Sequence, residues 1–179
     1  MNDIASLKFP VVGLGPSFGA GAKPGGETLD VFFVRQDLAE YPIAEIKLGV
    51  RNDMILADSA RRFWKIVHIH ELDPPVPLWR KIIGVVWWTP NFRRVSYQLE
   101  AMENLSWEEF KERVCASIDS DADLYCDAED FYRSHDLPST STGEECDAWI
   151  VKELEKLKRA VRAASTVGRI AKLTYPDGK

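Results

Sequence analysis

The sequence predicts an α+β fold, in which an antiparallel β meander of about five to six strands is followed by two C-terminal helices that pack on it. Short runs rich in β-branched and aromatic residues, separated by turn residues, follow one another between Thr28 and Met102. Near Asn104 the spacing of apolar residues changes to the three- and four-residue steps of a helix. Strands in one block and helices in the next are typical of the α+β class.

The length of 179 residues and the mass of 20.3 kDa predict one domain, which spans residues 1–179. Apolar residues make up 45% and charged residues 28% of the chain, close to the average of folded proteins. We divide the domain into four parts. They are a Gly/Pro-rich arm at 1–27, an antiparallel sheet at 28–102, an acidic helix and loop region at 103–136, and a basic amphipathic helix at 142–174.

The segment 10–26 contains six of the eleven glycines and three of the ten prolines, which predicts a flexible arm or a long loop without regular structure. A phosphate-binding loop would need a helix directly after the glycines. Lys23 is followed instead by Pro-Gly-Gly, so nucleotide binding is disfavoured.

Six runs are predicted as strands, and the turns between them are marked by Gly, Pro, Asn and Asp. In the second run apolar and polar residues alternate, whereas the fifth run, with Trp87 and Trp88, is apolar on both faces. The six runs are 29–34, 42–50, 54–59, 62–72, 81–89 and 93–102.

The first predicted helix begins after Asn104 or Ser106, either of which can cap its free N–H groups, and Glu108 and Glu109 lie in its first turn. The last predicted helix has a clear apolar stripe from Ile150 to Ala164 and a basic opposite face.

Three cysteines, Cys115, Cys126 and Cys146, form no CxxC pair and predict reduced thiols. No apolar run of about 18 residues occurs, and the N-terminus has no basic-then-apolar signal pattern. These features predict a cytoplasmic protein that does not interact with membranes.

The net charge of −5 is unevenly distributed along the chain. Residues 100–147 hold 15 acidic and 3 basic residues, whereas residues 148–179 hold 3 acidic and 8 basic residues. An acidic surface repels phosphate backbones and attracts cations or basic partners, so direct binding of nucleic acid is disfavoured.

One acidic string resembles the calcium loop of the EF-hand family. The resemblance implies Ca²⁺ ligands at loop positions one, three, five, seven, nine and twelve, which are Asp119, Asp121, Asp123, Tyr125, Asp127 and Asp130. Leu124 replaces the glycine of that family, and Asp130 replaces its chelating glutamate. The alternative is an acidic helical face without a metal.

Two further groups suggest metal chemistry. Asp30 followed by Glu45 and Lys47 resembles the core of the restriction-endonuclease-like nucleases, in which two carboxylates hold Mg²⁺. His68 and His70 are placed by period two on one strand face beside Trp64 and Ile66, a spacing that metal sites use. The alternative for the first group is an ordinary cross-strand charge pair. The alternative for the histidines is that hydrogen bonds, and not a metal, satisfy their nitrogen atoms.

The charge pattern favours a non-catalytic binding protein, of the kind that inhibits or confers immunity to a nuclease or another toxin, with a basic protein as its partner. Aromatic residues among the carboxylates would supply binding energy. The predicted contact residues are Glu103, Trp107, Glu108, Glu109, Glu112, Asp121, Asp123, Tyr125, Asp127, Phe131 and Tyr132. The second hypothesis is a metal-dependent protein, which either binds Ca²⁺ through 119–130 or hydrolyses its substrate with Asp30, Glu45 and Lys47. The sequence does not define an oligomeric state.

Overall fold

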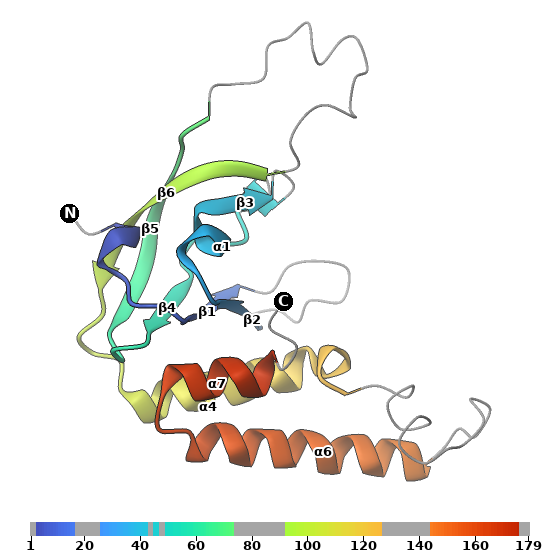
Figure 1. Ribbon diagram of the computed structural model, residues 1–179. Helices are drawn as coiled ribbons and strands as arrows, with labels where there is room; N and C mark the ends of the chain where they lie inside the picture. Colours follow the sequence, from blue (N-terminus) through green and yellow to red (C-terminus); the bar gives the residue numbers. More distant parts are fainter. Residues whose placement is uncertain are drawn as a thin grey trace, which may run out of the picture.

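The computed structural model describes residues 3–16, 26–42, 45–46, 49–73, 92–126 and 144–175. A curled six-stranded sheet lies on a layer of three helices, and shorter helical segments lie inside the curl (Figure 1). The strand order is β2-β1-β4-β5-β6-β3, and every neighbouring pair is antiparallel. This arrangement confirms the predicted α+β class and the packing of C-terminal helices on an antiparallel sheet.

The strands are β1 (Val11–Pro16), β2 (Glu27–Phe32), β3 (Glu40–Pro42), β4 (Ile55–Asp58), β5 (Phe63–Glu71) and β6 (Phe92–Ala101). The α-helices are α1 (Arg35–Ala39), α4 (Trp107–Ser120), α6 (Glu144–Ala163) and α7 (Val167–Thr174). Two short 3-10 helices, η1 (Ile4–Ser6) and η3 (Ala122–Leu124), complete the described elements.

The prediction that 10–26 lacks regular structure is wrong for residues 11–16, which form β1 between β2 and β4. The glycines of β1 leave room for the buried Met54 side chain, because a Cβ atom on Gly13 would lie 2.8 Å from Met54 Sδ and one on Gly15 would lie 2.9 Å from Met54 Cε. The alternating Val12 and Leu14 face the helices. Residues 17–25 lie outside the described part of the chain.

The predicted strand at 42–50 is also wrong in its described part. The strand β3 ends at Pro42, Glu45 and Ile46 are helical, and residues 49–53 form turns. Gly49 and Asp53 have φ angles of +68° and +61°, values that no strand can accommodate. The other runs correspond to β2, β4, β5 and β6, and the run at 81–89, with Trp87 and Trp88, lies outside the described residues.

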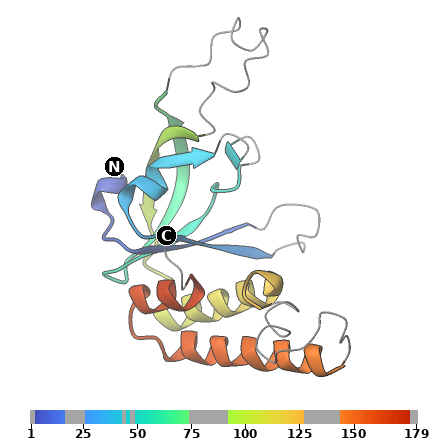
Figure 2. The same cartoon turned by 45° about the vertical axis from the view of Figure 1, so that its right-hand side comes forward.

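The predicted Ser106 cap is confirmed, because its side chain accepts a hydrogen bond from the Glu109 N–H at 3.1 Å. The helix predicted at 142–174 is instead two helices, α6 and α7. Thr166 interrupts it with extended backbone angles and caps α7 by accepting from the Arg169 N–H at 3.2 Å. This break lets α7 turn back and pack against β1 (Figure 2).

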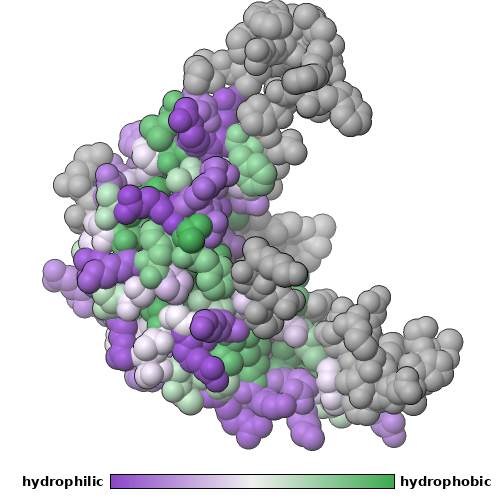
Figure 3. Space-filling view, in the orientation of Figure 1, coloured by the Kyte–Doolittle hydropathy of each residue, from purple (hydrophilic) through white to green (hydrophobic). Residues whose placement is uncertain are grey.

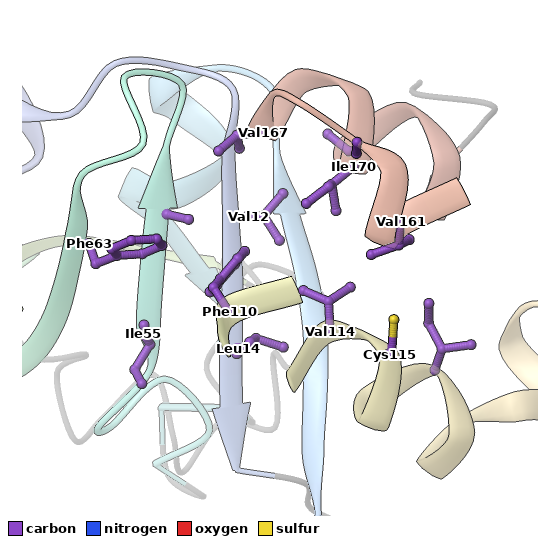
Figure 4. Close-up of a cluster of buried hydrophobic side chains, with 14 of the residues drawn as sticks. Val12, Leu14, Ile55, Phe63, Phe110, Val114, Cys115, Val161, Val167 and Ile170 are labelled. Atoms are coloured by element: carbon purple, nitrogen blue, oxygen red, sulfur yellow. The ribbon is translucent and has the colours of Figure 1, made fainter. Parts of the chain in front are cut away.

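Two hydrophobic clusters lie on the two faces of the sheet. One joins the sheet to α4, α6 and α7, with Val12 of β1 close to Val167 and Ile170 (Figure 4). The other fills the inside of the curl between β-strand residues, η1 and α1, and includes Tyr41 and Tyr97. The sheet is therefore covered on both faces, which explains why β1 and β4 are buried almost throughout.

Candidate binding cleft

Arg51 is a buried cation inside the curl of the sheet, with only 6% of its surface exposed. Its Nη1 donates hydrogen bonds to the carbonyl of Leu38 at 3.0 Å and to the hydroxyl of Tyr97 at 2.8 Å. Its Cζ lies 4.3 Å from the ring centroid of Tyr41 and 4.9 Å from that of Phe32. The guanidinium is thus held between two aromatic rings in one orientation.

The other edge of this guanidinium has free hydrogen-bonding capacity. Arg51 Nε is buried and has no hydrogen-bond partner, and no described residue accepts a hydrogen bond from Nη2. No carboxylate oxygen of a described residue forms an ion pair with Arg51. A buried N–H group without an acceptor costs free energy, so the Nε–H of Arg51 is an unsatisfied donor within the described part of the chain.

Arg51 lines a cleft of about 620 Å³ that follows β2, the strand at one end of the described sheet. We call this space the β2 cleft. Its walls combine apolar and aromatic side chains with a few polar groups, and they come from β2, α1, η3 and the end of α7. Its lining consists of Leu29, Asp30, Val31, Phe32, Phe33, Val34, Asp37, Arg51, Leu124, Tyr125, Thr174 and Tyr175.

Two carboxylates line the β2 cleft, and they differ in their partners. The carboxylate of Asp37 accepts hydrogen bonds from the N–H groups of Phe33 and Val34, both at 3.0 Å. Burial raises the pKa of Asp30 above its ordinary value of 3.8; the charge of Arg51 opposes this rise and the charge of Glu45 adds to it. Asp30 therefore takes up a proton more readily than an exposed aspartate does.

The phenols of the two tyrosines near Arg51 and of Tyr125, which directly follows η3, have raised pKa values. Burial raises the pKa of Tyr41 to about 12 and also raises the pKa of Tyr97, while nearby Arg51 opposes both changes. Burial, followed by the charges of Asp121 and Asp30, raises the pKa of Tyr125. All three phenols are neutral at physiological pH and are available as hydrogen-bond donors or acceptors.

The residues of the proposed nuclease core are only partly brought together. Asp30 and Glu45 are close enough for their charges to interact, although Glu45 lies on a helical turn and not on a strand. Lys47 lies outside the described residues. A described cation whose charge acts on Asp30 is Arg51, whose position the sequence pattern did not indicate.

The string that resembles a calcium loop is partly described. Asp119 is in the last turn of α4 and accepts a hydrogen bond from Lys158 Nζ at 2.8 Å, and Asp121 is the residue at which α4 ends. Tyr125 lines the β2 cleft. The side chain of Asp123 and all of Asp127 and Asp130 lie outside the described part, and no group of three potential metal ligands occurs within it.

The basic C-terminal helix lies against the acidic helix and neutralises part of it. Arg162 of α6 donates to both carboxylate oxygens of Glu112, at 2.8 and 3.0 Å, and Lys158 of α6 also contacts Glu155 at 2.5 Å. Glu108 pairs with Lys111 at 2.7 Å within α4. Glu103 and Glu109 are exposed and have no ion pair with a described residue.

The aromatic residues predicted as contact anchors are differently placed. Trp107 is half-buried and stacks on Phe110 and Phe63, with ring centroids 5.9 and 6.4 Å apart. The guanidinium of Arg61 lies 5.4 Å above the same ring. Trp107 is therefore part of the packing between α4 and the sheet, while Phe131 and Tyr132 lie outside the described residues.

The histidine pair lies on the exposed surface of β5. The rings of His68 and His70 are 4.2 Å apart, but the pairing with β6 shifts register between Ile66 and His68. This irregularity reverses the alternation, so Ile66 is buried while both histidines are exposed. The prediction that they share a face with Trp64 and Ile66 is therefore wrong.

These features define an α+β protein with a curled antiparallel sheet, a three-helix layer on one face and a cleft along one edge strand. No family model, curated protein or solved structure matches the chain. Within the described ranges, no helix has both the length and the apolar character needed to cross a bilayer.

Proposed function

We propose that the protein is a binding protein, and that its ligand carries a carboxylate group that Arg51 holds in the β2 cleft. The observation that carries this proposal is the buried guanidinium whose Nε has no acceptor and which lines the cleft. A carboxylate is planar and accepts two parallel N–H bonds, so it matches the Nε and Nη2 edge of an arginine. An acceptor from the ligand would offset the cost of the unpaired N–H.

The surroundings of Arg51 support a fixed binding geometry. Tyr97 and the Leu38 carbonyl hold Nη1, and the rings of Phe32 and Tyr41 hold the plane of the guanidinium. A donor that is already oriented loses little conformational entropy when the ligand arrives. The β2 cleft, at about 620 Å³, also falls within the range typical of small-ligand sites, roughly 300–1,000 Å³.

Asp30 determines how this binding would depend on pH. An ionised Asp30 would repel a ligand carboxylate, whereas a protonated Asp30 could donate a hydrogen bond to it. The groups that act on Asp30 are Arg51, Glu45 and the phenols of Tyr97 and Tyr125. Binding should therefore strengthen as the pH falls toward the raised pKa of Asp30, and Asp30→Asn should reduce this dependence.

The test follows the side-chain Nε–H signal of Arg51 in ¹H–¹⁵N spectra of the full chain during titration with hexanoate or with its neutral counterpart hexanamide. We expect a saturable shift with hexanoate and none with hexanamide. Equal shifts with both compounds, or no saturable shift with hexanoate, would contradict the proposal.

A pair of exposed leucines provides a matched control. Leu124 lies on the rim of the β2 cleft and is 76% exposed, whereas Leu72 is 58% exposed and does not line it. Leu124→Glu should weaken hexanoate binding by about threefold to tenfold through charge repulsion, and Leu72→Glu should not change it. Because both side chains are exposed, neither change should prevent folding.

A second candidate function is docking of a basic protein on the N-terminal half of α4. It is favoured by the exposed carboxylates of Glu103, Glu108 and Glu109, of which Glu108 has a side chain that is 78% exposed. The ion pairs of Glu112 and Asp119 with α6 restrict this surface to that end of the helix. Inhibition of a nuclease or toxin would be one use of such a surface.

Charge reversal tests this second candidate. We expect Glu108→Lys/Glu109→Lys to abolish salt-sensitive capture of a basic protein from the native host, with a fold unchanged by circular dichroism. Glu145→Lys/Asp147→Lys on α6 makes the same change in charge at exposed positions and should leave the capture intact. Equal recovery with both double variants would exclude docking through α4.

A further inference from the structure

A second groove, of about 480 Å³, shares part of its lining with the β2 cleft. We call it the α6–α7 groove, because its walls come mainly from those two helices and from η3. It shares Leu124, Tyr125 and Thr174 with the β2 cleft. The two spaces are therefore neighbours that share the wall formed by these three residues.

The walls of the α6–α7 groove are chiefly apolar. Trp149, Leu157 and Leu173 are half-buried there, and Leu154 is buried at its base. The two charged residues of its lining, Glu153 and Lys156, pair with each other at 3.1 Å. The groove thus offers apolar surface and little charge to a ligand, unlike the β2 cleft with Arg51 and Asp30.

We propose that the ligand is an amphipathic carboxylate, whose head group lies against Arg51 and whose apolar tail passes Tyr125 into the α6–α7 groove. This inference rests on the proposed function and adds the chemical class of the ligand. The charge of Arg51 selects the head group, and the apolar groove beside the β2 cleft, with its shared wall at Tyr125, selects a molecule with an extended apolar part. An alkyl chain suits the groove, because each methylene group that moves from water to an apolar surface makes the free energy of binding more favourable.

The energetics predict a measurable dependence on chain length. Each methylene that is fully removed from water raises the affinity by about fourfold. Four additional methylenes, as between hexanoate and decanoate, should therefore strengthen binding at least about tenfold even when the groove remains partly open to water.

The experiment measures the affinity of the full chain for hexanoate, decanoate and decanol by calorimetry, at concentrations below micelle formation, with the Arg51 Nε–H signal recorded in parallel. We expect decanoate to bind at least about tenfold more tightly than hexanoate, and decanol to bind much more weakly than decanoate. Both acids should shift the Arg51 signal.

Two substitutions on α6 locate the tail. Leu157→Gln places a polar group in the α6–α7 groove and should bring the affinity for decanoate close to that for hexanoate. Val151→Gln makes the same change at a residue that is 61% exposed and does not line the groove, so it should have no effect. An equal loss with both variants would overturn the assignment of the tail to this groove.

The outcomes separate this inference from the proposed function. Equal affinities for the two acids, with the Arg51 signal still shifting, would overturn the amphipathic ligand and leave the carboxylate site in place. Failure of both acids to shift Arg51 would overturn both proposals. If decanol bound as tightly as decanoate, the head group would not contribute and both would again be overturned.

Discussion

The hydroxyl of Tyr97 joins the buried guanidinium of Arg51 to the backbone of α1. It accepts a hydrogen bond from Arg51 Nη1 at 2.8 Å and donates one to the carbonyl of Leu38 at 2.9 Å. Tyr97 is 2% exposed, so water does not replace these bonds. The orientation of the proposed carboxylate donor thus depends on a residue of β6 that does not line the β2 cleft.

Tyr97→Phe should destabilise the fold by about 0.5–1.5 kcal/mol, because it removes two buried hydrogen bonds while Arg51 Nη1 and the Leu38 carbonyl remain bonded to each other at 3.0 Å. It should also weaken hexanoate binding, since Arg51 becomes less well oriented. Urea denaturation and the Arg51 titration measure the two effects. Unchanged stability would show that the hydroxyl is not needed to satisfy either group.

Asp30→Asn should stabilise the protein at neutral pH and not at acidic pH. Because burial raises the pKa of Asp30, ionising this carboxyl group costs more free energy in the folded state than in the unfolded state. The cost is absent below the ordinary pKa of 3.8 and grows as the pH rises through the folded-state pKa. We expect a gain of about 1 kcal/mol at pH 7, which is roughly 2–4 °C in Tm.

The corresponding measurement is a series of thermal melts of both proteins between pH 4 and pH 8. The difference in Tm should shrink steadily toward pH 4. A difference that is constant across this range would mean that the substitution acts through packing and not through the charge of Asp30.

Two glycines should respond oppositely to the same substitution. Gly13→Ala should destabilise the protein by about 1–3 kcal/mol, because the new Cβ would lie 2.8 Å from Met54 Sδ and 3.2 Å from the Phe32 ring. Gly168→Ala in α7 should stabilise it by about 0.5–1 kcal/mol, because the new Cβ would lie 3.5 Å from Pro10 and alanine favours the helix. Chemical denaturation of both variants measures the change in the free energy of unfolding. Equal changes for the two variants would contradict this description of the packing.

Trp107→Ala should cost about 2–4 kcal/mol, because Trp107 stacks on Phe110 and Phe63 between α4 and the sheet. Trp107→Phe should restore much of this loss by keeping an aromatic ring in place. Urea denaturation distinguishes the two variants. A negligible loss with alanine would instead favour Trp107 as a surface contact residue.

Local patterns predicted the elements whose residues specify their own conformation. The Ser106 cap, the stripe of Phe110, Val114 and Ile118 on α4, and the runs of β2, β4, β5 and β6 were all visible in residue type and spacing. β1 was missed because Gly13 and Gly15 favour loops by themselves. Their place in a strand becomes clear only from the structure, where Met54, 41 residues further along the chain from Gly13, occupies the space beside them.

The candidate cleft was even harder to predict from the sequence than β1, because its lining is brought together only by the tertiary structure. Sequence reasoning singled out Asp30, Glu45 and Tyr125 for other reasons, and the curl of the sheet places Asp30 and Tyr125 on one cleft with Arg51. Nothing in the turn around Arg51 distinguishes it from an exposed arginine. Its burial arises because β2 and α1, which precede it, and β6, which follows it about 40 residues later, close around it.

The amino-acid sequence by itself therefore determined the α+β class, the order of most elements and the uneven distribution of charge, since these follow from residue types and short-range periodicity. Only the tertiary structure decided which carboxylates are neutralised by α6 and that Arg51, although buried, keeps an Nε–H without an acceptor. Ion pairing and burial depend on distances between residues that are far apart in the chain, and such distances exist only once the sheet has curled and the helices have packed on it.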